Sequence, residues 1–251
     1  MKLEASIIIL CHNDAHYLEN CAKSVFRNTR GLAYELILVD NDSRDNALEI
    51  MRKLKKRAPC PVKIIRTGQN LFFAGGNFRG LQTASGRYVM FLNADTLVPP
   101  GWLKTMIALM DDNPRLGMVG PVTNSAVGPQ YTKAGCPDFK KLDAWHKDWV
   151  KRQPSAPLCV PWIIGFCVLM PRALALKTGG FDRAYGPGGY EDYDLCLKLR
   201  LLGKEIALAQ NCYVHHFGGK GYAGMDYHSL RATNQHLYWN AWSARLLERL
   251  S

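Results

Sequence analysis

Carboxylate and imidazole side chains gather in this sequence at points where an apolar run gives way to a loop or a helix. Asp95 follows the apolar run Tyr88 to Leu92, and Glu191-Asp192 follows a glycine-rich loop. An acid at the end of a buried strand can hold a divalent cation against a phosphate, and a carboxylate in a cleft can serve as a general base. The simpler alternatives are that Asp95 caps a turn and that Glu191-Asp192 stabilises the dipole of the helix it opens.

Apolar runs of β-forming residues, separated by helical patterns, must position these groups. The expected strands are 5–10, 35–39, 62–66, 88–92, 117–122, 160–170, 206–209 and 212–214. Their alternation with amphipathic helices predicts an α/β fold with a mostly parallel central sheet and helices on both faces. Ligands bind such sheets at the carboxyl ends of the strands, which is where Asp95 lies.

Two glycine-rich stretches could approach a ligand closely. The first, 68–77, contains Gly75-Gly76, which allow positive φ and leave the N–H groups of the next helix free for a phosphate or a ribose. It is not G-x-G-x-x-G, so the dinucleotide fingerprint is absent. The second, 218–222, carries Lys220, which could close over a diphosphate.

Composition narrows the class of protein. A chain of 251 residues that is 47% hydrophobic can bury the core of one large α/β domain. The net charge of +11 indicates an anionic partner, either nucleotide phosphates or a membrane surface. Nucleic-acid binding would rest on charge alone, and we do not expect it. The eight cysteines include no C-x-x-C pair and are typical of reduced thiols in a cytoplasmic protein.

The chain divides into one large domain and a terminal helix. Residues 1–228 are expected to form the domain, and 123–157, rich in proline and glycine, to form an irregular excursion on the acceptor side with one short helix. Residues 229–251 predict an amphipathic helix that docks on the domain, with dimerisation or peripheral membrane contact as alternatives. The longest apolar stretch, 158–170, contains Pro161 and is shorter than the roughly 20 residues of a spanning helix.

Six motifs occur in an order that is highly specific when taken together. They are SIIILCHND, ELILVDNDSRDN, NLFFAGGNFRG, FLNADTLVPPGWL, GGFDRAYGPGGYEDYDLCLKLRLLG and VHHFGG. With these motifs the sequence resembles the family 2 glycosyltransferases of the GT-A nucleotide-sugar-binding fold, particularly their rhamnosyltransferase-like branch. The resemblance covers nearly the whole chain except the excursion at 123–157 and the final helix.

The resemblance implies a nucleotide-sugar site on particular residues. The positions that match the family's nucleotide-sugar contacts are Asp40, Asn41, Ser43, Asn70, Gly75, Gly76, Asn77, Asn93 and Ala94. The donor would be a UDP-, dTDP- or GDP-sugar, and the acceptor a glycan, a lipid-linked glycan or a protein. Lys220 would then contact the diphosphate.

The resemblance also implies a cofactor and a reaction. The family's D-x-D motif stands here as Asn93-Ala94-Asp95, so its first acid is replaced and Asp95 becomes the expected ligand of Mn²⁺ or Mg²⁺. A late histidine completes the metal site in similar enzymes; the match favours His215 and leaves His216 open. Asp192 is the expected base beside Glu191, which implies a single displacement with inversion. Residues 40, 95, 192 and 215 are therefore expected to converge on one hollow.

Two other functions fit the same fold. A nucleotidyltransferase usually carries a glycine-rich basic loop after its first strand, where this chain has Cys11-His12-Asn13-Asp14. A non-catalytic subunit that binds nucleotide sugar or glycan would explain the missing first acid of the metal motif. The intact Glu191-Asp192 pair favours catalysis over both.

Overall fold

The computed structural model describes residues 2–218 and 226–250, apart from the side chains of 227 and 244–250. The strands in this part of the chain are β1 (Ala5–Cys11), β2 (Tyr34–Asp40), β3 (Val62–Arg66), β4 (Tyr88–Asn93), β5 (Thr96–Leu97), β6 (Leu116–Val122), β7 (Leu158–Cys159), β8 (Cys167–Pro171), β9 (Glu205–Tyr213) and β10 (His215–His216). The α-helices are α1 (Ala15–Asn28), α2 (Ala47–Arg57), α3 (Phe72–Thr83), α4 (Trp102–Asp112), α5 (Leu142–Arg152), α6 (Arg172–Thr178), α7 (Glu191–Leu201) and α8 (Tyr227–Leu250).

The main sheet has the strand order β3-β2-β1-β4-β8-β6-β9-β7. β1 pairs in parallel with both β2 and β4, and β2 pairs in parallel with β3, whereas β8 runs antiparallel between β4 and β6. The predicted α/β fold with a mostly parallel sheet is therefore confirmed. Because β1, β2 and β4 share one direction, the loops that follow them meet at one edge of the sheet.

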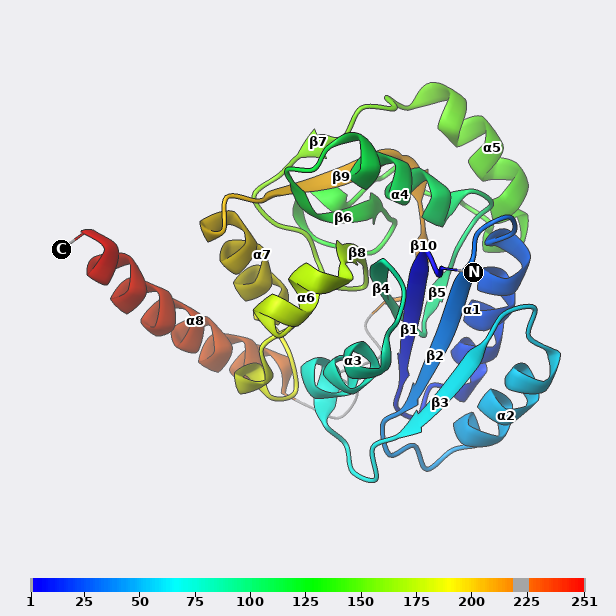
Figure 1. Ribbon diagram of the computed structural model, residues 1–251, viewed down its shortest axis with the longest axis horizontal. Helices are drawn as coiled ribbons and strands as arrows, with labels where there is room; N and C mark the ends of the chain where they lie inside the picture. The colour runs from blue at the N-terminus through cyan, green and yellow to red at the C-terminus, as the bar shows by residue number, and fades with distance from the viewer. Residues whose placement is uncertain (1, 219–225, 251) are drawn as a thin grey trace.

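Helices cover both faces of the sheet, which explains why its central strands are apolar without alternation (Figure 1). Ile7 and Ile9 of β1 belong to the core shared with α1, α2 and α4. Ile8, which points the other way, belongs to the core shared with α3, α6 and α7. Each isoleucine is fully buried, which stabilises the fold by about 1.5–3 kcal/mol per side chain.

A short two-stranded ribbon brings the end of the domain back to β4. β10 pairs antiparallel with β5, so that His216 lies opposite Thr96 and His215 lies opposite Leu97. Since Thr96 directly follows Asp95, this pairing carries the histidine doublet of the late chain to the acid at the end of β4.

Two of the predicted strands differ from those observed. The expected strand at 160–170 forms only from Cys167, because the backbone N–H of Ile164 donates to the side chain of Gln130 and not to a neighbouring strand. Residues 160–166 therefore form a loop that reaches the sheet edge. The two expected strands at 206–209 and 212–214 are the single strand β9, which continues to Tyr213.

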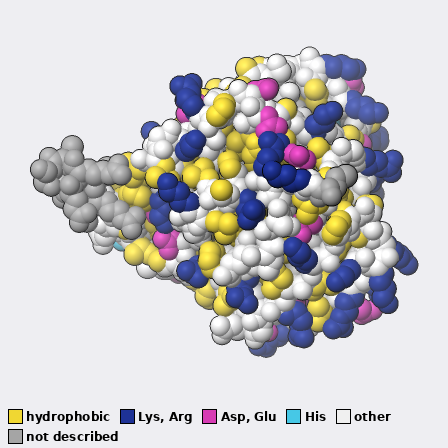
Figure 2. Space-filling model, in the orientation of Figure 1, with side chains coloured by type: hydrophobic (Ala, Val, Ile, Leu, Met, Phe, Trp, Pro, Cys, Tyr) yellow, Lys and Arg dark blue, Asp and Glu magenta, His cyan; other side chains and the backbone are white. Residues whose placement is uncertain are grey.

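The excursion at 123–157 contains the predicted short helix as α5, and its Leu142 and Trp149 pack with Tyr213 of β9. α8 runs away from the body of the molecule towards the C-terminus (Figure 1). No described helix is both long enough and apolar enough to cross a membrane. On the face shown in Figure 2, Lys and Arg side chains are scattered among other types and do not form one continuous stripe.

Candidate active site

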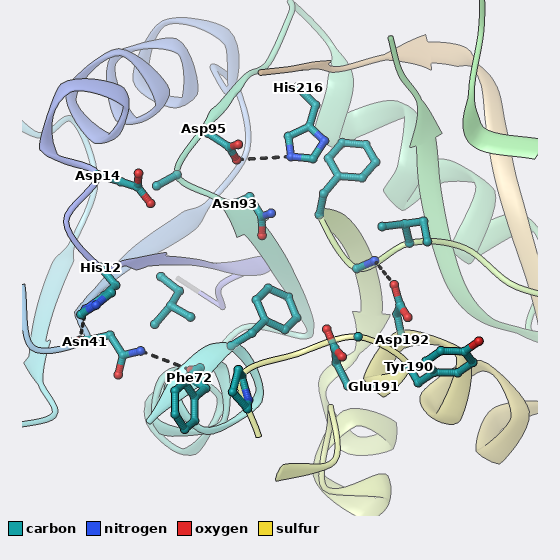
Figure 3. Close-up of a pocket in the computed structure, with 18 of the residues that line it drawn as sticks. His12, Asp14, Asn41, Phe72, Asn93, Asp95, Tyr190, Glu191, Asp192 and His216 are labelled. Atoms are coloured by element: carbon teal, nitrogen blue, oxygen red, sulfur yellow. Dashed lines mark hydrogen bonds and ion pairs between the residues drawn. The ribbon is translucent and has the colours of Figure 1, made fainter. Parts of the chain in front are cut away.

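A cavity of about 480 Å³ lies at the carboxyl ends of β1, β2 and β4, where the start of α7 faces them. Eight of the predicted site residues line it, namely Asn41, Asn70, Asn93, Ala94, Asp95, Glu191, Asp192 and His216. Figure 3 shows His12, Asn41 and Phe72 on one side of this cavity and Tyr190, Glu191 and Asp192 on the other. We call these sides the Asn41 wall and the Asp192 wall.

Asp95 and His216 form a pair between the two walls. One carboxylate oxygen of Asp95, Oδ1, lies 3.3 Å from Nε2 of His216. The other, Oδ2, accepts the backbone N–H of Gly218 at 3.1 Å. The imidazole of His216 is stacked on Phe166, with ring centroids 4.7 Å apart and planes 11° apart. Contacts on several sides therefore fix the orientation of both groups.

The structure places His216, and not the favoured His215, beside Asp95. Neighbouring residues of a β-strand point to opposite faces, so only one member of the doublet can face the cavity. The ring of His215 packs against Phe139 and Phe217 instead, and its Nδ1 lies 3.4 Å from the hydroxyl of Tyr213. Burial and the neighbouring His216 lower the pKa of His215. The expected role of His215 as a metal ligand is not supported by this geometry.

The Asp95–His216 pair fits a divalent cation. Nδ1 of His216 lies 2.9 Å from the backbone oxygen of Ser125, and a carbonyl can only accept, so Nδ1 carries a proton. In the neutral imidazole the lone pair on Nε2 then faces a carboxylate oxygen, which is the arrangement of two ligands around a cation. No group of three or more His, Cys, Asp or Glu suited to a metal occurs in the described part of the chain. A bound cation would need further ligands from a substrate or from water.

Asp14 also lines the cavity close to Asp95 (Figure 3). Burial raises the pKa of Asp14, and the nearby charge of Asp95 raises it further. Two carboxylates this close together create a negative electrostatic potential, which would stabilise a positive ion there. This position could not be predicted from the sequence, where Asp14 is simply the residue before α1.

The Asn41 wall is a closed hydrogen-bond network. Nδ1 of His12 donates to the backbone oxygen of Asn41 at 2.8 Å, which leaves its Nε2 to accept from Nδ2 of Asn70 at 3.3 Å. The side-chain amide of Asn41 donates to Oδ1 of Asn70 at 2.8 Å and accepts the N–H of Leu71 at 2.9 Å. This wall is rigid because each of its polar side chains is held by another.

Asp40 and Ser43 lie behind this wall and do not line the cavity. Oδ1 of the buried Asp40 accepts the backbone N–H of Ser43 at 3.0 Å, and its Oδ2 lies 3.6 Å from Nε of Arg66. The hydroxyl of Ser43 accepts the N–H of Asn13 at 3.2 Å. Both residues therefore shape the loop after β2, because their side chains are occupied by the turn itself.

Gly75, Gly76 and Asn77 also lie outside the cavity lining. They belong to α3 and do not adopt positive φ, contrary to expectation. A Cβ on Gly76 would stand 2.3 Å from Cδ1 of Leu10, so this glycine lets α3 lie close against β1. The side chain of Asn77 donates to the backbone oxygen of Phe73 within the same helix at 3.0 Å. Lys220 lies outside the described residues.

The Asp192 wall carries two buried carboxylates. Asp192 accepts the backbone N–H of Tyr193 at 2.9 Å and that of Gly165 at 3.3 Å. Oε2 of Glu191 is buried without a hydrogen-bond partner in the described part of the chain. Gly165 belongs to the loop at 160–166 that was expected to be a strand, so this departure from the prediction supplies a contact to Asp192.

Burial raises the pKa of both acids, since a low-dielectric site disfavours the charged form. The charge of Asp192 raises the pKa of Glu191 further. Backbone N–H groups favour the ionised form of both acids, but Oε2 of Glu191 is buried without a described donor. The pair therefore holds a proton on Glu191 and a carboxylate on Asp192 near neutral pH, which suits Asp192 to accept a proton.

Strained backbone gathers around the cavity. The non-glycine residues with positive φ in the described chain are Asn13, Asp42, Phe72 and Tyr190, and all except Asp42 line the cavity. Left-handed backbone costs of order 1–3 kcal/mol for such residues and persists where the surroundings enforce it. The positive φ of Phe72 and Tyr190 could not be predicted from the sequence. The sequence also missed His12 and Arg231, which line the cavity from α1's preceding loop and from α8.

Residues 6–174 match the sequence model of Glycosyl transferase family 2. The match covers more than half of the chain, and the chain therefore belongs to this family. A putative polypeptide N-acetylgalactosaminyltransferase 13 of Drosophila melanogaster is 27% identical over 239 residues, which are 86% of this chain and 42% of that protein. The chain thus spans less than half the length of this relative.

Two solved structures resemble the fold. GalNAc-T7 with UDP, GalNAc and Mn²⁺ has a TM-score of 0.69 at 18% identity, covering 86% of this chain and 44% of that one. Mannosyltransferase PcManGT from Pyrobaculum calidifontis, in complex with GDP-Man and Mn²⁺, has a TM-score of 0.64 at 18% identity, covering 91% and 60%. The expected GT-A fold is confirmed. The rhamnosyltransferase-like branch stays a prediction.

Proposed function

We propose that this protein transfers a sugar from a nucleotide-diphosphate donor to an acceptor hydroxyl, by a single displacement with inversion. The observation that carries the proposal is that one cavity joins the Asp95–His216 pair to the buried Asp192. A leaving-group site and a base on separate sides of one cavity are what an inverting displacement requires. The family and the bound ligands named for the two similar structures support the same class of donor.

The nucleotide lies along the Asn41 wall in this proposal, with the sugar directed towards Asn93. The side chain of Asn93 points into the cavity between the two walls (Figure 3). Its amide can hydrogen-bond a sugar or ribose hydroxyl without adding a charge. The closed network of His12, Asn41 and Asn70 keeps this surface in one conformation, which lowers the entropic cost of binding.

Mn²⁺ or Mg²⁺ would be held by Asp95 and His216 in this proposal. When bound, it would neutralise the negative charge that the diphosphate gains as the sugar–phosphate bond breaks. Gly218 donates its N–H to Asp95 and Phe166 stacks on His216, so these neighbours orient both ligands. The replacement of the first acid of the motif by Asn93 leaves the site with less negative charge of its own.

Asp192 accepts the proton of the attacking hydroxyl. Burial raises the pKa of Asp192, which strengthens it as a base, while the N–H groups of Tyr193 and Gly165 keep it ionised and oriented. Glu191 retains its proton beside it and so avoids a second negative charge in the same wall. The hydroxyl oxygen attacks the anomeric carbon as the bond to the diphosphate breaks, and no covalent intermediate with the protein forms.

The acceptor is a glycan, a lipid-linked glycan or a protein, and the sugar is a hexose or rhamnose. The excursion at 123–157 and α8 border the acceptor side, and the domain at 1–228 carries the donor site. The cytoplasmic placement, peripheral membrane contact and homodimer expected from the sequence remain predictions.

A panel of UDP-, dTDP- and GDP-sugars tests the proposal. Each donor is incubated with the protein and Mn²⁺, and nucleoside diphosphate release and the shift in melting temperature are recorded. We expect one nucleotide to raise the melting temperature by several degrees at about 100 times its Kd, since binding at that excess stabilises by about 2.7 kcal/mol. EDTA should remove most of this shift.

The Asp192→Asn variant is the matched control for catalysis. It should bind the same donor and fail to transfer sugar. If no donor on the panel changes the melting temperature or releases nucleotide with wild-type protein, the proposed function is wrong.

A further inference from the structure

The first half of α8 is fastened to the loop that presents the Asp192 wall. The side-chain amide of the buried Asn234 donates to the backbone oxygens of Tyr185 at 2.8 Å and Gly188 at 2.9 Å. Further along, Nε1 of Trp242 donates to Oδ1 of Asp194 at 3.0 Å. α8 is thus joined to both the loop before α7 and to α7 itself, and it is part of the wall's support.

Arg231 stands one helical turn before Asn234, on the same side of α8. It lines the cavity together with Tyr190 and Asp192, although it is far from them in the sequence and lies outside the region that the family model matches. Arg231 is exposed, and its side chain makes no hydrogen bond or ion pair within the part of the chain that the structure describes. Five N–H donors are therefore available to a ligand in the cavity.

Aromatic rings continue the same wall. The ring centroids of Tyr190 and Tyr193 are 5.3 Å apart, and those of Tyr190 and Tyr238 are 5.5 Å apart. Tyr190 keeps its position only by adopting a φ of +79°, which is unfavourable for an aromatic residue. Such rings offer flat apolar faces with hydroxyls at their edges, which suit a sugar ring with an apolar C–H face and a polar rim.

We propose that Arg231 binds an acidic group, a carboxylate or a phosphate, on a saccharide acceptor whose ring lies against Tyr190 and Tyr193. This inference rests on the proposed function and names the class of its acceptor. The guanidinium matches either acid with two parallel hydrogen bonds. Its helix α8 is fastened to the loop and the helix that carry the Asp192 wall, and this assigns Arg231 to the acceptor and not to the donor diphosphate.

An acidic acceptor would also need a cation at this place. The ionised Asp192 already places a buried negative charge in the wall, and a further negative charge beside it would be repelled without compensation. Burial raises the pKa of Asp192, and the charge of Arg231 offsets a small part of that rise, so this charge reaches the base. The same charge can therefore offset the acid of an acceptor while the hydroxyl of that acceptor meets Asp192.

Matched sugars test the inference on protein loaded with Mn²⁺ and the nucleotide that the donor panel identifies. Methyl β-glucuronide carries a carboxylate, glucose 6-phosphate carries a phosphate, and methyl β-glucoside carries neither. Binding of each is titrated by ligand-observed NMR. We expect at least one acidic sugar to bind about tenfold more tightly than the neutral one, the equivalent of about 1.4 kcal/mol. The acidic sugar that binds more tightly shows whether the acceptor group is a carboxylate or a phosphate.

Substitutions then assign this preference to Arg231. Arg231→Gln should remove the preference and leave donor binding intact, and Arg231→Lys, which keeps the charge, should restore part of the preference. Arg57→Gln, on the exposed face of α2, is the control for loss of a surface charge and should change nothing.

Equal binding of acidic and neutral sugars by wild-type protein would overturn the inference, as would a preference that survives in Arg231→Gln. A shift of the pH profile of donor hydrolysis in Arg231→Gln without any change in acid preference would also overturn it, because Arg231 would then act only through Asp192. If wild-type protein binds none of the nucleotide-sugar donors, the proposed function is refuted instead.

Discussion

The two walls of the cavity differ in how their polar groups are satisfied. On the Asn41 wall, the side chains of His12, Asn41 and Asn70 hydrogen-bond to one another or to nearby backbone. On the Asp192 wall, Glu191 has a buried oxygen without a described partner, and the pKa of both acids is raised by burial. The first wall is therefore a rigid surface whose polar side chains already have partners. The second retains unfavourable electrostatics that chemistry can use.

The largest effect is expected from removing the base. Asp192→Asn keeps the shape of the side chain but cannot accept the proton of the acceptor hydroxyl. Turnover should fall by about 10²–10⁴-fold, while the affinity for the donor stays within about twofold of wild type. Steady-state kinetics and calorimetry measure the two quantities. Wild-type turnover by this variant would exclude Asp192 as the base.

The next effect distinguishes the two neighbouring histidines. His216→Ala removes the imidazole beside Asp95 and should lower the Mn²⁺-dependent affinity for nucleotide at least about tenfold. His215→Ala, which alters a ring packed against Phe139 and Phe217, is its matched control and should leave that affinity nearly unchanged. Calorimetry with and without Mn²⁺ measures the difference. A larger loss in His215→Ala would favour the original expectation from the sequence.

The pH dependence of transfer should reveal the burial of the Asp192 wall. A base must be deprotonated, so the rate should rise with pH by about tenfold per unit below the pKa of Asp192 and then level off. Because burial raises that pKa, the levelling should occur above the ordinary range of an aspartate. Rates measured with saturating donor at several pH values provide the test. A profile that is already flat at the ordinary aspartate pKa would contradict it.

The smallest effect concerns stability. The pKa of Glu191 is raised in the folded protein, so the folded state binds more protons than the unfolded state and its stability decreases as pH rises through that interval. Glu191→Gln cannot ionise and should melt about 2–4 °C above wild type in mildly alkaline buffer. In acidic buffer, below the ordinary glutamate pKa, the difference should shrink. Thermal melts at both pH values test this, and a constant difference would argue against ionisation as its cause.

The parallel half of the sheet could be predicted closely from the sequence. The strand Val62–Arg66 has the expected bounds, because apolar runs between turn residues depend on local chemistry. The loop at 160–166 was mistaken for a strand, since its apolar residues line the cavity and the N–H groups of Ile164 and Gly165 bond to the side chains of Gln130 and Asp192. An apolar run reports burial, and burial alone does not specify a strand.

The candidate site was predicted unevenly for a related reason. Asp95 and Asp192 could be found because an acid at the end of a strand or the start of a helix stands out locally. Gly76 was misassigned, because a glycine that admits a ligand and one that admits Leu10 look the same in a sequence. Arg231 gave no local signal, since only the docking of α8 brings it to the cavity.

By itself, the sequence determined the α/β fold, the glycosyltransferase family and the acids Asp95, Glu191 and Asp192 of the cavity, because each depends on residue type and local order. Only the tertiary structure decided which histidine faces Asp95, since that depends on the register in which β10 pairs with β5. Tertiary structure alone also carried Arg231 to the Asp192 wall and turned Asp40 and Ser43 away from the cavity. Contacts between distant segments settle such choices, because a side chain's direction is fixed by what its backbone pairs with.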